Sequence, residues 1–133
     1  MIEMCKRLGI VAAVLLMMIS ISLGYTVDIK SNDKIGKYLV NEHGMTLYYF
    51  DNDPVKTSTC FEGCAATWPP FHAEYIDIPG EMASSNFDEI GRVDGVYQTT
   101  YKGRPLYLYS GDRNPGEING EGMNGLWFAV SPI

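Results

Sequence analysis

After residue 24 the chain alternates between short apolar runs and clusters of Gly, Asn and Asp. Runs rich in Tyr, Val, Thr, Leu and Phe with this punctuation are typical of β-strands joined by tight turns. KYLVNEHGMTLYYF (37–50) and VYQTTYKGRPLYLY (96–109) each predict a hairpin, with Gly44 and Gly103 at turn positions that need a positive φ. YTVDI and DEIGRV predict leading strands, and TWPPF and GLWFAV predict closing strands. No segment is typical of a long helix.

The two hairpins belong to an internal duplication. Residues 36–71 align with residues 95–130 without a gap, at a constant offset of 59 and with nine identities. The identical pairs include the only two tryptophans of the chain and are Gly36 and Gly95, Tyr38 and Tyr97, Gly44 and Gly103, Leu47 and Leu106, Tyr48 and Tyr107, Asp53 and Asp112, Glu62 and Glu121, Gly63 and Gly122, and Trp68 and Trp127.

This duplication predicts an all-β fold. Each repeat is expected to form an antiparallel unit of about four strands, and two half-buried units bury their apolar faces against each other. We therefore expect residues 25–133 to form a single β domain, a pseudo-twofold sandwich or barrel of two repeats. Residues 74–86 have no counterpart in the second repeat and are expected to link the two.

The N-terminal segment predicts export. Lys6 and Arg7 precede an uncharged apolar run, residues 8–23, that ends in small residues. This arrangement is typical of a secretory signal peptide over residues 1–24. An uncleaved anchor is the alternative, and it would touch the membrane only through residues 8–23.

The charge of the chain limits its partners. The net charge is −6, and removal of residues 1–24 takes away two basic residues and one acidic residue, which makes it −7. An acidic surface without a Lys/Arg cluster repels phosphate backbones, so nucleic acid is not an expected partner. Divalent cations or a basic partner fit this surface better.

The strand LYYF ends in a loop that carries an acidic residue. Alternation along the strand places Tyr48 and Phe50 on one face and Leu47 and Tyr49 on the other. The aromatic face either packs in the core or forms an exposed binding surface. Asp53 is expected to accept backbone hydrogen bonds in the following turn. Alternatively, Asp53 and its repeat mate Asp112 approach a shared axis and hold a cation or act as an acid and base pair.

Cys60 and Cys64 are the only cysteines after the apolar run, and an even pair in an exported protein predicts a disulfide. A helical turn over CFEGC would bring them close enough to bond. The alternative is a redox role, or a copper or zinc site that adds His72, His43 or Met45.

The loop SGDRNPGEINGEG, residues 110–122, is rich in glycine and in oxygen ligands. Asp112, Glu117 and Glu121 are its candidate ligands for Ca²⁺, although the spacing does not match an EF-hand. A plain connecting loop is the alternative. The chain has no GxSxG elbow, no phosphate-binding GxxxxGK[ST] loop, no HExxH motif, and no GxGxxG that follows a strand and opens a helix, so an enzyme is not favoured.

Four features together carry a resemblance to a known family. They are Tyr48-x-Phe50-x-x-Asp53, its second copy Tyr107-x-Tyr109-x-x-Asp112, the segment STCFEGCAATWPPF and the segment YKGRPLYLYSGDRNPGEINGEGMNGLWF. Over residues 35–132 the chain resembles the secreted or lipoprotein repeat family known for a Yx(F/W/Y)xxD motif, a family of unknown function. The resemblance implies export and duplication, and it suggests a loose association with alkane breakdown. This chain departs from the lipoprotein members because its third cysteine, Cys5, precedes the apolar run.

Two functions follow from the sequence. The first is an exported or cell-surface, non-catalytic module that binds a cell-surface component, a protein or a small apolar ligand, without a cofactor. The second is an extracytoplasmic metal-binding or redox protein that uses Cys60 and Cys64. The candidate binding residues are the motif residues and the tryptophans: Tyr48, Phe50, Asp53, Trp68, Tyr107, Tyr109, Asp112 and Trp127.

Overall fold

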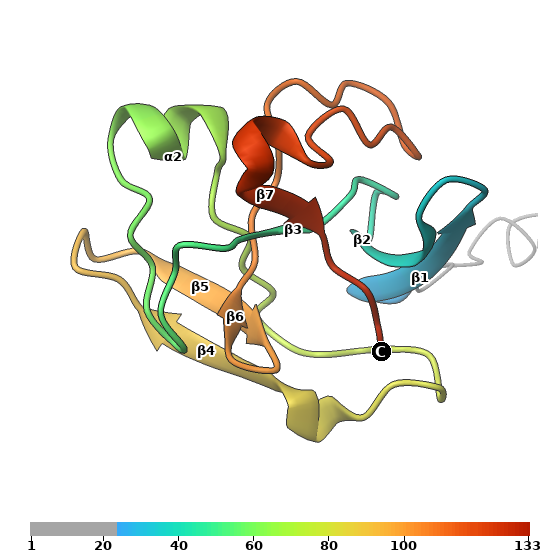
Figure 1. Cartoon of the computed structure of the whole chain (residues 1–133). Coiled ribbons are helices and arrows are strands. Elements are labelled where there is room, and N and C mark those ends of the chain that lie inside the picture. The colour runs from blue at the N-terminus through green and yellow to red at the C-terminus, as the bar shows by residue number, and fades with distance from the viewer. Residues whose placement is uncertain (1–23) are drawn as a thin grey trace, which may run out of the picture.

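The computed structural model describes residues 24–133 (Figure 1). The predicted signal peptide or anchor lies, apart from residue 24, outside the described residues. Within them the chain forms strands, turns and very short helices. In chain order these are β1 (Val27–Asn32), β2 (Gly36–Asn41), β3 (Tyr48–Phe50), α2 (Gly63–Thr67), η1 (Ser84–Asn86), β4 (Phe87–Gly91), β5 (Tyr97–Tyr101), β6 (Arg104–Pro105), η2 (Met123–Gly125) and β7 (Trp127–Ala129). No helix in this part of the chain is long and apolar enough to cross a membrane.

The strands form three small antiparallel sheets, β1–β2, β3–β7 and β4–β5–β6. The leading strand of each repeat pairs antiparallel with the next strand along the chain. Ile29 lies opposite Leu39 in the first repeat, and Glu89 lies opposite Thr99 in the second. In Figure 1 the β3–β7 pair crosses between the β1–β2 hairpin and the β4–β5–β6 sheet. The predicted all-β, two-repeat fold is confirmed, in a sandwich-like form without barrel closure.

The turn glycines take the backbone conformation that the sequence predicted. Gly44 has a φ of 78° and Gly103 a φ of 80°. Lys102, with a φ of 49°, precedes Gly103, so two left-handed residues join Tyr101 of β5 to Arg104 of β6. Two-residue hairpins favour this geometry because its twist matches that of the flanking strands.

The motif strands cross from one repeat to the other. β3 pairs with β7, so that Tyr49 lies opposite Phe128. At the equivalent place in the other half, the Leu108 amide donates to the Pro69 carbonyl (2.8 Å). Tyr48 and Tyr107, which are repeat mates, exchange two backbone hydrogen bonds of 2.8 Å each. The pseudo-twofold axis therefore passes between these two tyrosines, and the repeats interlock.

This crossing corrects two details of the sequence prediction. The hairpin expected over residues 37–50 closes only around the turn, through a bridge between Val40 and Thr46, because β3 leaves for β7. TWPPF was expected to be a strand, but it forms only a bridge between Pro70 and Tyr107. Proline has no backbone N–H, so Pro69 and Pro70 cannot donate to a full ladder. The first repeat consequently has three strands rather than about four.

The core has two parts. One is mostly aliphatic and lies between the hairpins, and residues 74–86 cover it with Ile76, Ile78 and Met82. The other is mostly aromatic and surrounds the pseudo-twofold axis; it consists of Tyr48, Cys60, Trp68, Tyr107 and Trp127. This second part contains most of the candidate residues of the motif.

Candidate functional site

Four aromatic rings stack across the pseudo-twofold axis. Trp68 and Trp127 lie face to face with ring centroids 3.9 Å apart and planes 2° apart. Phe50 stacks on the outer face of Trp127, and Tyr109 stacks on Trp68, each with centroids 4.3 Å apart. The stack contains two pairs of repeat mates, Trp68 with Trp127 in the middle and Phe50 with Tyr109 at the ends. It is therefore symmetric about the pseudo-twofold axis.

The motif tyrosines bind the motif aspartates of the opposite repeat. The Tyr48 hydroxyl donates to Asp112 Oδ2 (2.6 Å), and the Tyr107 hydroxyl donates to Asp53 Oδ2 (2.6 Å). Tyr48 packs edge-on against Trp68, and Tyr107 packs edge-on against Trp127. Each copy of the motif Yx(F/W/Y)xxD thus supplies one ring to the stack, the donor of one hydrogen bond between the repeats and the acceptor of the other.

Burial controls the protonation of this cluster. Burial raises the pKa of both tyrosine hydroxyls, and their bonds to the carboxylates raise it further, so both remain protonated donors. Burial also raises the pKa of Asp112. Asp53 is less enclosed, and its second oxygen accepts from the amide and the hydroxyl of Thr59 (2.8 and 2.7 Å).

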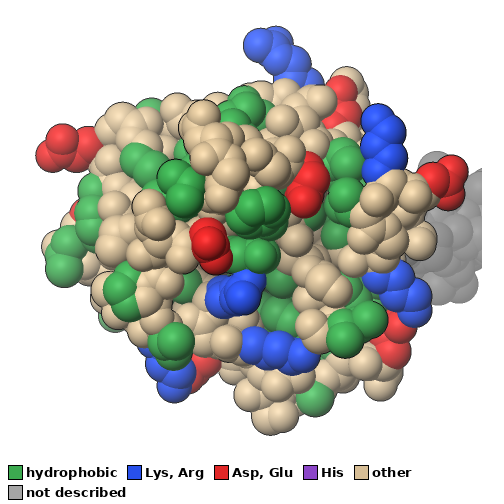
Figure 2. Space-filling model, in the orientation of Figure 1, with side chains coloured by type: hydrophobic (Ala, Val, Ile, Leu, Met, Phe, Trp, Pro, Cys, Tyr) green, Lys and Arg blue, Asp and Glu red, His purple; other side chains and the backbone are tan. Residues whose placement is uncertain are grey.

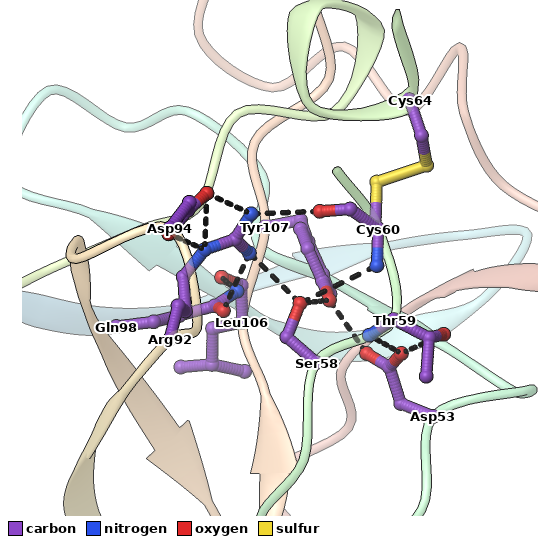
Figure 3. The surroundings of a disulfide bond; sticks show 10 residues. All are labelled: Asp53, Ser58, Thr59, Cys60, Cys64, Arg92, Asp94, Gln98, Leu106 and Tyr107. Atoms are coloured by element: carbon purple, nitrogen blue, oxygen red, sulfur yellow. Dashed lines mark hydrogen bonds and ion pairs between the residues drawn. A yellow bond between two sulfur atoms is a disulfide. The ribbon is translucent and has the colours of Figure 1, made fainter. Parts of the chain in front are cut away.

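A buried arginine joins the disulfide loop to the second repeat (Figure 3). The Arg92 side chain is 0% exposed, and its guanidinium donates to Ser58 Oγ, Gln98 Oε1, the Cys60 carbonyl and Asp94. Ser58 in turn bonds the Tyr107 hydroxyl (2.7 Å). Since the Tyr107 proton is given to Asp53, Ser58 is the donor in this pair. The chain of bonds therefore runs from Asp94 to Asp53 through both repeats.

Cys60 and Cys64 form a disulfide, with an S–S distance of 2.08 Å and a Cα–Cα distance of 5.2 Å. Cys64 lies in the short helix α2, but that helix begins only at Gly63. The helical turn expected over CFEGC is therefore wrong: Glu62, with a φ of 52°, turns the chain before the helix. Bonded sulfurs are not thiolates, so the pair cannot bind a metal in this state. His72 pairs with Glu89, and His43 with Glu42. Within residues 24–133 no three His, Cys, Asp or Glu side chains gather as a metal site would require.

The acidic residues of loop 110–122 bind their own backbone. Glu117 accepts from the amides of Arg113 and Asn114 (2.6 and 2.8 Å), and these bonds lower the pKa of the Glu117 carboxyl. Glu121 accepts from the amide of Ala129 (2.6 Å). Asp112 accepts from Tyr48 and from the amide of Asn119 (2.9 Å). Asp112 and Glu117 thus close the loop on itself, and Glu121 binds it to β7.

The structure brings all eight candidate binding residues together, but in the interior. Tyr48 and Tyr107 are fully buried, Trp68 and Trp127 almost so, and Phe50 and Tyr109 half-buried at the ends of the stack. The carboxylates of Asp53 and Asp112 each bind a tyrosine and backbone groups. Sequence reasoning missed Arg92, because its position in the first repeat is Asp33 and the duplication therefore gives no signal for it.

Comparison with known protein families gives one result. A family model described as a secreted repeat of unknown function matches the chain twice, over residues 31–72 and 90–131. The two matches contain both copies of the motif and both tryptophans. Neither curated proteins nor solved structures gave a match.

Proposed function

The chain belongs to the family of secreted repeats of unknown function, and we propose that it is an exported, non-catalytic binding module. One observation carries this proposal: the polar ends of the motif, two tyrosine hydroxyls and two carboxylates, bind each other across the repeats. The motif then serves to lock two repeats together. A partner would therefore bind to the outer surface of the module.

The state of the carboxylates supports a non-catalytic role. A general acid or base must reach its substrate within hydrogen-bond distance and exchange a proton with it. Asp112 is 8% exposed and accepts from Tyr48 and Asn119, and Asp53 accepts from Tyr107 and Thr59. Both carboxylates thus act as structural acceptors.

The disulfide supports the same role. A catalytic disulfide needs a sulfur that an external thiolate can attack. Cys60 is fully buried, and its carbonyl accepts from Arg92 (2.7 Å). Cys64 is partly buried and packs against the aromatic part of the core. The bridge therefore fixes the loop that holds Arg92, next to the aromatic stack.

Two measurements on the exported protein, purified from the medium without chelator, test the proposal. Native mass spectrometry should give a chain that starts near Tyr25 and is two hydrogens lighter than the reduced form. The fluorescently labelled protein should bind saturably to cells of the producing strain. The double variant Cys60→Ala/Cys64→Ala should bind equally well. Thiol–disulfide exchange activity that this variant loses, together with an absence of cell binding, would show a redox protein instead.

A further inference from the structure

The pseudo-twofold relation extends from the core to two hollows on the surface. One hollow, of about 370 Å³, lies between β3, the β5–β6 turn and the C-terminal segment. The other, of about 240 Å³, lies at the equivalent place in the other half. Four pairs of their lining residues are repeat mates at the offset of 59: Tyr101 and Glu42, Val130 and Phe71, Ser131 and His72, and Ile133 and Glu74.

The two hollows have opposite charge. The larger one is lined by Lys102 and Arg104 and by no acidic side chain, and we call it the cationic hollow. Its mate is lined by Glu42 and Glu74. Met45 occupies the position of Arg104 in the first repeat, and His43 that of Lys102. The same backbone frame therefore carries different chemistry in the two repeats.

Aromatic rings hold both cations of the cationic hollow. The Arg104 guanidinium lies 3.9 Å from the centroid of the Tyr49 ring, and the Lys102 ammonium lies 5.5 Å from that of Tyr101. Among the described residues neither cation has a carboxylate within 4 Å, whereas Lys37, Lys56 and Arg92 each pair with one. Figure 2 shows Lys and Arg side chains next to apolar side chains over β3 and β6.

The backbone around the cationic hollow is fixed. The Tyr101 hydroxyl donates to the Pro132 carbonyl (2.6 Å) and so holds the C-terminal wall in place. Lys102 has a φ of 49°, a conformation that favours Gly and Asn in such a turn. A lysine in this conformation costs conformational energy, and strained residues of this kind cluster at ligand sites.

We propose that the cationic hollow binds a small organic molecule that carries an oxyanion, a carboxylate or a phosphate, on an apolar body. The Arg104 fork suits two oxygens of such a group, and Lys102 adds a second positive charge. Tyr49, Ala129 and Val130 supply apolar contact for the body. The volume falls in the range of small-molecule sites, about 300 to 1,000 Å³. This inference rests on the proposed binding role and gives that role a ligand class.

The test is a titration of the exported, isotope-labelled protein, followed by NMR, with benzoate, phenyl phosphate and the uncharged benzamide. We expect one or both anions to shift the amide signals of residues 101–104, 129–131 and 133 to saturation, and we expect benzamide to bind at least tenfold more weakly. The stronger anion identifies the oxyanion. Saturation by neither anion, or equal binding of benzamide, would overturn the proposal.

Two variants of the cationic hollow and one control test the site. Arg104→Met installs the residue of the equivalent position, and it should weaken the anion about tenfold. Lys102→Asn removes the other charge and relieves the turn, so it should weaken binding several-fold while raising the urea midpoint of unfolding. Lys37→Met removes the same charge at a paired site away from the hollow and should change neither affinity nor chemical shifts. If Lys37→Met lost as much anion affinity as Arg104→Met, the affinity would depend only on the net charge of the protein, and the proposed site would be wrong.

The same variants separate this inference from the proposed function. Suppose that Arg104→Met and the native protein bind the producing cells equally strongly and that no anion saturates the hollow. The proposed binding module is then supported, and the proposed anion site is wrong. Suppose instead that no form of the protein binds cells, but the native protein binds an anion and Arg104→Met does not. The anion site is then supported, and the cell-surface role is wrong.

Discussion

The Tyr48 hydroxyl makes its hydrogen bonds with polar groups of the other repeat. Its hydroxyl donates to Asp112 and accepts from the Gly120 amide (3.2 Å), and both partners belong to the second repeat. Gly120 is needed for this approach, since a Cβ at that position would lie 2.7 Å from the Trp68 ring. One side chain thus couples the motif strand, the acidic loop and the aromatic stack.

We predict that Tyr48→Phe destabilises the protein by about 1 to 3 kcal/mol, because it leaves a buried carboxylate and a buried amide without their partner. The free energy of unfolding from urea denaturation measures this loss. Tyr97→Phe is the matched control, since the Tyr97 side chain is 59% exposed, and it should stay within about 0.5 kcal/mol of the native protein. A Tyr48→Phe protein as stable as the control would contradict the role of the hydroxyl.

Asp94 supplies the carboxylate that pairs with the buried guanidinium of Arg92, and this contact makes stability depend on pH. Hydrogen bonds from Arg92 lower the pKa of the Asp94 carboxyl below its ordinary value of 3.8. A carboxyl with a lowered folded-state pKa adds stability above its unfolded pKa, and this stability is lost as the pH falls through the folded-state pKa.

Asp94→Asn is therefore expected to be less stable than the native protein between pH 5 and 7, and the difference should shrink as the pH falls below 3.8. Urea midpoints measured from pH 2.5 to 7 give the two curves. Asp33→Asn, which removes a carboxylate without a hydrogen bond in the described structure, should run parallel to the native curve. A difference between Asp94→Asn and native protein that is constant with pH would show that Asp94 acts through packing alone.

Among the elements, turns and leading strands were predictable and strand partners were not. The glycines at positions 44 and 103 encode the turns locally, and the leading strands follow from their composition. The pairing of β3 with β7 is not local, because Tyr48–Phe50 shows the same alternation whichever strand it joins. The repeated identities pointed to the motif residues, whereas the burial of their polar ends depends on the crossing of the strands.

The element most open to direct test is the loop that leads into α2, which the disulfide closes. A bridge over four residues stabilises by about 2 kcal/mol through the entropy of the unfolded chain, and its local span cannot hold the repeats together. Its second effect is to place the Cys60 carbonyl under Arg92.

Cys60→Ala/Cys64→Ala should therefore lose about 2 kcal/mol of unfolding free energy and keep the native fold. Urea denaturation gives the loss, and the NMR shifts of the indole N–H groups of Trp68 and Trp127 report whether the stack persists. Reduction of the native protein should reproduce both results. If the two indole N–H signals of the double variant lost their native chemical shifts, the disulfide would be needed to maintain the whole aromatic core.

For the molecule as a whole, the crossing of β3 and β7 makes the two repeats one folding unit. Each repeat holds one tryptophan of the stack, one motif tyrosine and the aspartate that the other tyrosine needs. A chain of this size has little area to bury per repeat, so a single repeat leaves an aromatic face and a strand edge in water. Duplication is thus a condition of stability here.

A chain divided after Gly80, an exposed turn residue, tests this interdependence. Fragments 25–80 and 81–133 should each be unfolded alone, with poorly dispersed NMR spectra, because β3 and β7 are on different fragments. Mixed in equal amounts, they should assemble and restore the native indole signals. Trp127→Ala in the second fragment removes half of the tryptophan pair, worth about 3 to 5 kcal/mol, and should abolish assembly at the same concentration. A single fragment that gives a dispersed spectrum would show that one repeat can bury its own aromatic face, and the exchanged Tyr–Asp bonds would then join two independent units instead of completing one.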